Sequence, residues 1–364
     1  MDWSFPMSRD KRILFAVLGW GLGHATRSIP LIRELSEKHR LIIASSGAAL
    51  RLLKDEFPDL DAVEFPDYDI YYPNNKHLVI PSLGLQLPKI LVQLFREFHL
   101  TQKLVTKYHI QRIISDCCYG VFSTQVPCFF ITHQLRFMLT GLLRCLVIPS
   151  EWFNRYMFRH YKRIIVPDTI QPNNLAGSLA HSGSIATHPK LFYLGILSSV
   201  QKQALNEDID ILFSVSGPEK QRTIFEKLIL NQLPHVPGKK VVVLGKPGGS
   251  ASGEKQKDTI KFNYADRQLM NELMNRAKLI VCRPGYSTVM ELVALNKSAL
   301  FIPTPGQAEQ EYLGRYYQQT GLFQVANQNH LDLPNAIDKI RQNSCTTLPD
   351  VVINDTSKFL RLIA

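Results

Sequence analysis

The segment from Ala277 to Gly321 constrains the fold more than any other part of this chain. It opens with the apolar run Leu279 to Cys282, which is typical of a buried parallel strand, and continues with the string RPGYSTVMEL. The proline and glycine predict a tight turn, and the hydroxyl residues behind them predict a helix N-cap at Ser287 or Thr288. Backbone N–H groups and a hydroxyl aimed at one point favour a bound phosphate. An ordinary strand, turn and helix is the alternative.

The second half of the same segment adds candidate ligands for a sugar. Glu291 lies about one turn into the predicted helix, where its carboxylate could bind two hydroxyls of a ribose. The run from Ala299 to Ile302 predicts another strand, and the loop behind it, in the string PTPGQAEQ, leads into a further helix. Glu309 and Gln310 stand at that helix start and could bind sugar hydroxyls.

These two strings resemble the GT-B glycosyltransferases, in particular the branch of the peptidoglycan N-acetylglucosaminyltransferase MurG and the UDP-glucuronosyltransferase-like proteins. The resemblance rests on two motifs in the right order with one strand between them. It implies an α/β fold of two Rossmann-like doubly wound domains that face a cleft. It also implies an inverting, metal-independent transfer of a hexose-type sugar from a nucleotide sugar to an acceptor hydroxyl, with a UDP-sugar as the first candidate for the donor. No cofactor is expected beyond this substrate.

The resemblance places the donor in the C-terminal half. In the family the glycine turn and its hydroxyl bind the diphosphate, the helix glutamate binds the ribose, and the final acidic-Gln pair binds the sugar. Ser216 and Gly217, in a short turn after the predicted strand Ile209 to Val215, are a thin match to the family's Gly-rich donor loop. Lys246 or Arg283 could stabilise the leaving diphosphate, although Lys246 could equally be a surface lysine. The predicted donor-binding residues are Ser216, Gly217, Lys246, Arg283, Gly285, Tyr286, Ser287, Thr288, Glu291, Glu309 and Gln310.

A Gly-rich loop, GWGLGHATR, follows the first predicted strand, Ile13 to Leu18. Its glycines do not fit the pattern GxGxxG, which argues against a dinucleotide dehydrogenase. The loop does fit the N-terminal motif of the family, in which glycines precede a histidine that faces the cleft. His24 is therefore the candidate general base, because a neutral imidazole can take a proton at pH 7. A capping or core histidine is the alternative. Gly23 and Arg27 are predicted to meet the acceptor, Arg27 through a carboxylate or phosphate.

Two other predicted strands end in candidate acceptor residues. One ends at Asp116, and the run Phe129 to Thr132 delivers His133 and Gln134 at its carboxyl end. The last two partly resemble the His-Glu-Gln-Asn corner of MurG. We expect Asp116 and His133 to bind the acceptor or to orient His24, with a structural role as the alternative.

At 364 residues the chain is long enough for two α/β domains. Strand and helix patterns alternate in two blocks, and the polar stretch Ser198 to Asp208 is a plausible linker. We predict an acceptor-binding domain over 1–200, a donor-binding domain over 208–345 and a segment 346–364 whose helix, by resemblance, crosses back to the first domain. The Tyr-, Asn- and Pro-rich stretch from Pro66 to Pro88 predicts a long surface loop.

The formal net charge of +11 favours an anionic partner. Basic residues are interleaved with aromatic and apolar ones over 136–163, which is typical of a segment at an anionic membrane surface, and a lipid-linked or membrane-bound acceptor would match. Packed helices with arginine stems along them are the alternative. No nucleic-acid-binding signature is visible, so no nucleic acid partner is expected.

Other features point to a cytoplasmic protein, peripheral at most on the cytoplasmic membrane face. No apolar run reaches the length of a spanning helix. The six cysteines lack CxxC spacing and mostly lie in apolar segments, which predicts reduced thiols and no metal site. Two other functions stay open: a UDP-sugar 2-epimerase of the same fold, and a non-catalytic subunit that binds nucleotide sugars or docks on membranes.

Overall fold

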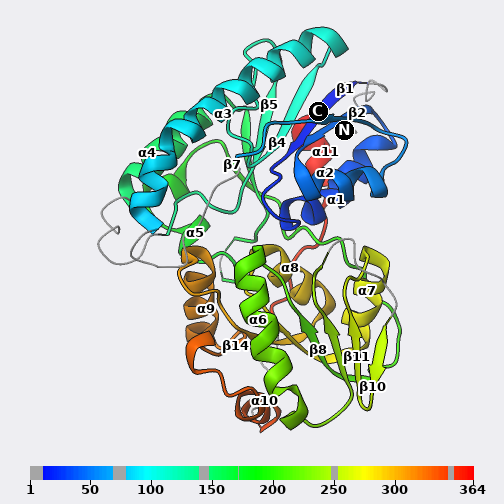
Figure 1. Ribbon diagram of the computed structural model, residues 1–364. Helices are drawn as coiled ribbons and strands as arrows, with labels where there is room; N and C mark the ends of the chain where they lie inside the picture. Colours follow the sequence, from blue (N-terminus) through cyan, green and yellow to red (C-terminus); the bar gives the residue numbers. More distant parts are fainter. Residues whose placement is uncertain (1–10, 69–78, 139–146, 171, 247–252, 343–347) are drawn as a thin grey trace, which may run out of the picture. The chain divides into compact units, whose positions relative to one another are not determined.

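The computed structural model describes residues 11–68, 79–138, 147–170, 172–246, 253–342 and 348–364. The chain forms two compact units: one extends to Ser199 and includes Val351–Ala364, and the other is Val200–Asp350. In the described part of the chain, each unit is built around one sheet of seven strands (Figure 1).

The first sheet is parallel throughout its described strands, in the order β3-β2-β1-β4-β5-β6-β7. Its central strands are apolar runs because helices cover both faces, and Ile13 to Val17 are at most 1% exposed. The strands are β1 (Arg12–Val17), β2 (Arg40–Ser45), β3 (Asp61–Glu64), β4 (Arg112–Asp116), β5 (Cys128–Ile131), β6 (Arg163–Val166) and β7 (Leu191–Tyr193).

Helices cover the two faces of this sheet, with α1, α2 and α11 on one face and α3 and α4 on the other (Figure 1). The C-terminal helix α11 packs on α1, because Phe359 is fully buried in the same apolar cluster as Ile29 and Ile32. The chain end therefore completes the core of the first unit. The helices are α1 (Gly23–Ser36), α2 (Gly47–Glu56), α3 (Val79–Tyr108), α4 (Val147–Phe158), α5 (Ser178–His181), η3 (Ser184–Thr187) and α11 (Thr356–Ile363).

The long loop predicted over Pro66 to Pro88 is wrong in its second half. Helix α3 begins at Val79 and passes through Pro88, while 69–78 lie outside the described residues. Further along, α3 buries one face at a spacing of four residues, at Gln93, Glu97 and Thr101. This packing outweighs the backbone hydrogen bond that a proline inside a helix removes.

The second sheet has the order β10-β11-β9-β8-β12-β13-β14. Its described strands pair in parallel except β10, which forms an antiparallel hairpin with β11. The strands are β8 (Ile209–Ser214), β9 (Lys240–Val243), β10 (Glu254–Gln256), β11 (Thr259–Phe262), β12 (Ala277–Cys282), β13 (Ser298–Phe301) and β14 (Gln324–Val325). The helices of this unit are α6 (Glu219–Gln232), η4 (Leu233–His235), α7 (Arg267–Arg276), α8 (Tyr286–Leu295), α9 (Ala308–Thr320), η5 (Gln328–His330) and α10 (Leu333–Gln342).

In each sheet the strand order reverses beside the first strand of the unit, between β1 and β4 and between β8 and β12. The predicted fold class of two Rossmann-like doubly wound domains is thereby confirmed. Open α/β sheets bind ligands outside the carboxyl ends of their strands at such reversal points. The predicted motifs lie there, with Gly23 to Arg27 at the start of α1 after β1, and Arg283 to Ser287 in the turn after β12 and the start of α8. Among the helices that the structure describes, none has the length and apolar character needed to cross a membrane.

Candidate active site

The glycine loop after β1 sets the position of His24. An added Cβ at Gly19 would lie 1.9 Å from Ser46 Oγ, so only glycine fits against that residue without a shift. Gly21 has a φ of +77°, a conformation that side chains disfavour. Helix α1 then begins at Gly23, one residue before His24, and so holds the imidazole at the carboxyl edge of the sheet.

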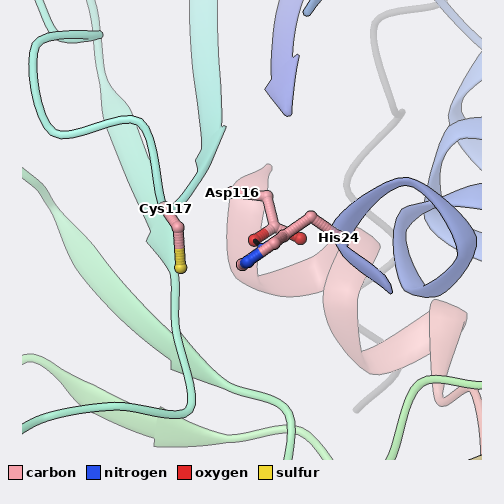
Figure 2. Close-up of side chains that lie close together, drawn as sticks. All are labelled: His24, Asp116 and Cys117. Carbon is pink, nitrogen blue, oxygen red and sulfur yellow. Dashed lines mark hydrogen bonds and ion pairs between the residues drawn. The ribbon is translucent and has the colours of Figure 1, made fainter. Parts of the chain in front are cut away.

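His24 is paired with a buried carboxylate from the neighbouring strand. Its Nδ1 lies 2.9 Å from Oδ1 of Asp116, the last residue of β4 (Figure 2). Burial and the charge of Arg27 lower the pKa of His24, but the charges of Asp116 and Cys117 and the Asp116 hydrogen bond outweigh them and raise this pKa to about 9. The His24 side chain is 18% exposed. A carboxylate that accepts from Nδ1–H leaves Nε2 as the nitrogen that gains or loses a proton. With a pKa of about 9 most of the ring is protonated at pH 7, so only its neutral fraction, which grows as pH rises toward 9, can act as a general base.

Arg27 has a different place from the one predicted. Its Nε donates to Asp116 Oδ2 at 2.8 Å, its Nη1 lies 2.9 Å from His133 Nδ1, and its Nη2 lies 2.9 Å from His24 Nδ1 and bonds Asp116 Oδ1. The side chain is 1% exposed. Arg27 therefore belongs to a buried network, which corrects the expectation that it meets an acceptor. Burial would raise the pKa of Asp116, but the charges of Arg27 and His24 and their hydrogen bonds hold it well below its usual range.

Two further residues, not predicted from the sequence, belong to this network. Ser28 Oγ donates to Asp116 Oδ2 at 2.9 Å, and Cys117 Sγ lies 3.5 Å from Arg27 Nη2. Ser28 stands four residues after His24, a spacing that puts both on one face of a helix and would have pointed to it. Cys117 directly follows Asp116 and has a φ of +59°. No sequence pattern predicted this backbone conformation or the contact with Arg27.

The remaining predicted acceptor residues lie beside the network. His133, just after β5, is 5% exposed and reaches Arg27. Gln134 is half-buried, and its backbone N–H donates to Thr132 Oγ1 at 3.1 Å. Gly23 supplies the first residue of α1. The structure thus brings His24, Asp116, Arg27 and His133 together.

In the second unit the turn after β12 starts a helix, but its cap differs from the predicted one. Helix α8 begins at Tyr286 with Gly285 as N-cap and no side-chain capping bond, so the N-cap predicted at Ser287 or Thr288 is wrong. Both hydroxyl residues instead lie in the first turn and are half-buried, while Tyr286 is 2% exposed. Gly285 is still extended, with φ −74° and ψ 136°, and the helical course begins at Tyr286, so the hydroxyl residues stand one and two positions inside the helix. The helix N-terminus still carries positive polarity that suits a phosphate.

Arg283 and Lys246, the two predicted cations, have different surroundings. Arg283 is 2% exposed, donates to Ile302 O at 2.7 Å and to Gln328 Oε1 at 2.5 Å, and stacks on the ring of Phe225. Burial lowers the pKa of Arg283 to about 9. Its terminal nitrogens are thus engaged inside the unit. The more exposed Lys246 pairs with Glu226 at 2.6 Å, after β9.

Glu291 lies in the second turn of α8 and is half-buried. After burial, its charge is a further cause of the raised pKa of the Cys282 thiol at the end of β12. Ser216 and Gly217 are exposed in the turn after β8, the other strand beside the reversal point, and Gly217 has a φ of +119°. These residues therefore flank β8 and β12 at their carboxyl ends.

The loop after β13 is held by side chains from the first turn of α9. Gln310 Oε1 accepts from the N–H of Thr304 at 2.9 Å, and Glu311 Oε1 accepts from the N–H of Gly306 at 2.8 Å. Gln307 caps α9 by accepting from the N–H of Gln310. Since the oxygen of Gln310 is engaged, its amide NH₂ is the group it can offer to a sugar hydroxyl, while the half-buried Glu309 offers acceptor oxygens.

Comparisons with known proteins agree with this layout. Residues 222–363 match the glycosyltransferase family 28 C-terminal domain, and residues 11–138 match glycosyl transferase family 1. Over 350 residues the chain is 20% identical to an uncharacterized glycosyltransferase of Methanopyrus kandleri, covering 92% of this chain and 95% of that protein. A stretch of 68 residues is 37% identical to the UDP-N-acetylglucosamine--N-acetylmuramyl-(pentapeptide) pyrophosphoryl-undecaprenol N-acetylglucosamine transferase of Albidiferax ferrireducens. This stretch spans only 16% of the chain and 18% of that relative.

Solved structures show the same fold at low sequence identity. The calicheamicin glycosyltransferase CalG4 superposes with a TM-score of 0.62 at 13% identity, covering 92% of this chain and 91% of that one. MurG of Acinetobacter baumannii gives 0.56 at 15% identity, over 97% and 99%. The Streptomyces sp. SF2575 glycosyltransferase SsfS6, complexed with thymidine diphosphate, gives 0.59 at 11% identity, over 97% and 94%. The chain is a glycosyltransferase of the GT-B fold, as its two C-terminal motifs predicted.

Proposed function

We propose that the enzyme transfers a hexose-type sugar from a nucleotide sugar, first of all a UDP-sugar, to an acceptor hydroxyl with inversion at the anomeric carbon. The observation that carries this proposal is the 2.9 Å pair of His24 Nδ1 and Asp116 Oδ1 at the reversal point of the first sheet. A histidine that is partly exposed, oriented by a buried carboxylate and set behind a glycine loop has the properties of a general base.

The reaction is a single displacement. In its neutral form, His24 takes the proton of the acceptor hydroxyl at Nε2 while that oxygen forms a bond to the anomeric carbon. The bond from this carbon to the diphosphate oxygen breaks, and its electron pair leaves with the nucleoside diphosphate. Asp116 stabilises the imidazolium that results. The polarity of the α8 N-terminus and the charge of Lys246 favour the leaving diphosphate, so the proposed step uses no metal ion.

The donor assignment rests on the second unit. Gly285, Ser287 and Thr288 would hold the diphosphate, Glu291 the ribose, and Glu309 with Gln310 the sugar. Support comes from the thymidine diphosphate complex of SsfS6 and from the UDP-N-acetylglucosamine in the name of the Albidiferax relative. We choose a uridine nucleotide because that relative shares the higher sequence identity over its aligned stretch.

The acceptor is proposed to be lipid-linked and to be met at an anionic membrane surface. The Albidiferax relative is named for a pyrophosphoryl-undecaprenol acceptor. In this chain α3 exposes Leu87, Leu91 and Phe95, and α4 exposes Ile148, Trp152 and Tyr156, each set spaced by four residues. Exposed apolar stripes with cations beside them suit the boundary between lipid headgroups and acyl chains. The cations near these stripes are Lys89 and Arg96 on α3, Arg155 on α4 and Arg159 directly after α4.

His24→Ala tests the proposal. We expect transfer to fall at least about a hundredfold, because the general base is lost, while UDP still raises the melting temperature as in the wild type. His99→Ala, at an exposed histidine of α3, is the control and should leave both unchanged. Unaltered turnover of His24→Ala would remove His24 from the mechanism. Incubating the UDP-sugar without acceptor separates the alternatives, since a 2-epimerase converts the sugar and a transferase does not.

A further inference from the structure

Arg27 occupies the centre of a group of potential metal ligands. His24 Nδ1, Asp116 and Cys117 Sγ each offer a ligand atom, and these atoms lie within 4.8 Å of one another (Figure 2). Nη2 of Arg27 lies 2.9 Å from His24 Nδ1 and 3.5 Å from Cys117 Sγ, and it bonds Asp116 Oδ1. The guanidinium therefore already stands where a metal ion would have to sit.

The same guanidinium extends to a third strand. Its Nη1 lies 2.9 Å from Nδ1 of His133, which follows β5. A guanidinium only donates hydrogen bonds, so a hydrogen bond between these two atoms needs the His133 tautomer with its hydrogen on Nε2. His24 Nδ1, whose hydrogen goes to Asp116, lies beside Nη2 without accepting from it. Arg27 thus connects α1 with the carboxyl ends of β4 and β5, and it does so from a position that solvent does not reach.

We propose that Arg27 is a positioning residue, a built-in cation that replaces a metal ion among His24, Asp116 and Cys117 and holds the base in register. Its charge opposes that of Asp116, so the carboxylate orients His24 while the His24 proton is held less tightly than the carboxylate alone would hold it. The kinetic part of this inference rests on the proposed role of His24, whereas the arrangement of the network does not.

The alternative is that Arg27 only fills space in a buried core. Titration of the His24 ring by NMR separates the two and needs no enzyme activity. The titratable and charged groups that face this ring are Asp116 at the end of β4, Cys117 directly after it and Arg27 on α1, with His133 joined through Arg27. Because the charge of Arg27 lowers the pKa of His24, Arg27→Met should raise that pKa above its wild-type value.

A double variant keeps the test decisive where Arg27→Met does not fold. Arg27→Met with Asp116→Asn removes both buried charges together, so no ion is left unpaired. Burial then acts on the ring without the carboxylate, and the pKa of His24 should fall below its wild-type value. The single and double variants are thus expected to shift the titration in opposite directions. A folded variant whose His24 titrates as in the wild type would overturn the proposal.

Kinetics supply the second readout. In Arg27→Ala we expect kcat at pH 7 to fall about 10- to 100-fold, with little change in KM for the donor, and the pH midpoint of kcat/KM to move upward. Added guanidinium chloride at millimolar concentration should restore part of kcat. Arg33→Ala on the same helix, whose partner Glu56 lies outside the network, is the matched control and should show neither change. Absence of rescue, with a pH profile like the wild type, would contradict a positioning role. If His24→Ala keeps its activity, the proposed function fails, and the NMR titration still decides this inference.

Discussion

Glu97 is a buried acid that the proposed reaction does not use. It lies on α3, is 2% exposed, and its Oε2 accepts from the Tyr68 hydroxyl at 2.7 Å and from the N–H of Gly120 at 3.0 Å. Burial raises the pKa of Glu97 to about 7, although these two hydrogen bonds lower it. The residue joins the chain behind β3 and the loop behind β4 to the long helix, so its protonation bears on the stability of the first unit.

The expected pH dependence follows from the direction of this shift. A carboxyl whose folded pKa is raised binds a proton more tightly when folded, so its contribution is complete below pH 4.5 and is lost as pH rises to about 7. The loss amounts to roughly 3 kcal/mol for a shift of this size. Glu97→Gln keeps an oxygen for both donors and should lose less stability between pH 5 and pH 8, as measured by urea unfolding. Glu37→Gln, at an exposed site, should behave like the wild type. Equal pH slopes for both variants would show that Glu97 is not destabilised by burial.

At the scale of elements, the sequence predicts the helices and strands that show a clear hydrophobic pattern and the doubly wound fold that their order along the chain implies. Apolar runs such as Leu279 to Cys282 marked the strands, because strands covered on both faces carry few polar residues. Helix α3 was missed over Val79 to Pro88, because its prolines resemble loop signals and only packing of its later turns reveals the helix. The contact between Arg27 and His133 was not predicted, because it depends on where three elements place their side chains in space, and spacing along the chain does not encode this.

Helix α11 offers the clearest prediction at this scale. Phe359 is fully buried in the core that α11 shares with α1, so Phe359→Ala should leave a cavity. We expect a loss of about 3–5 kcal/mol in the free energy of unfolding of the first unit, followed by urea titration. Arg361→Ala, on the exposed side of the same helix, should cost less than about 0.5 kcal/mol. A small effect of Phe359→Ala would mean that the first unit is stable without its C-terminal helix.

For the molecule as a whole, the two units divide the chemistry in the proposed function. The first carries the candidate base at the β1–β4 reversal, and the second carries the candidate donor residues at the β8–β12 reversal. Each doubly wound sheet has a reversal point at the carboxyl ends of its strands, so the same architecture can position the candidate base in one unit and the candidate donor residues in the other. The net charge of +11 adds a long-range attraction to anions, which is a property of the whole chain and does not depend on the individual contacts within either unit.

That charge and the apolar stripes of α3 and α4 together predict how the enzyme meets a bilayer. The wild type should sediment with phosphatidylglycerol vesicles at low salt but not with phosphatidylcholine vesicles, and salt should weaken the binding because it screens exposed charges. Phe95→Ser and Trp152→Ser, which remove side chains 65% and 68% exposed, should each weaken binding about tenfold through lost apolar burial. Ile224→Ser, at an exposed position of α6 in the other unit, is the control and should bind like the wild type. Failure to sediment at low salt, or equal binding by all three variants, would place the acceptor surface elsewhere.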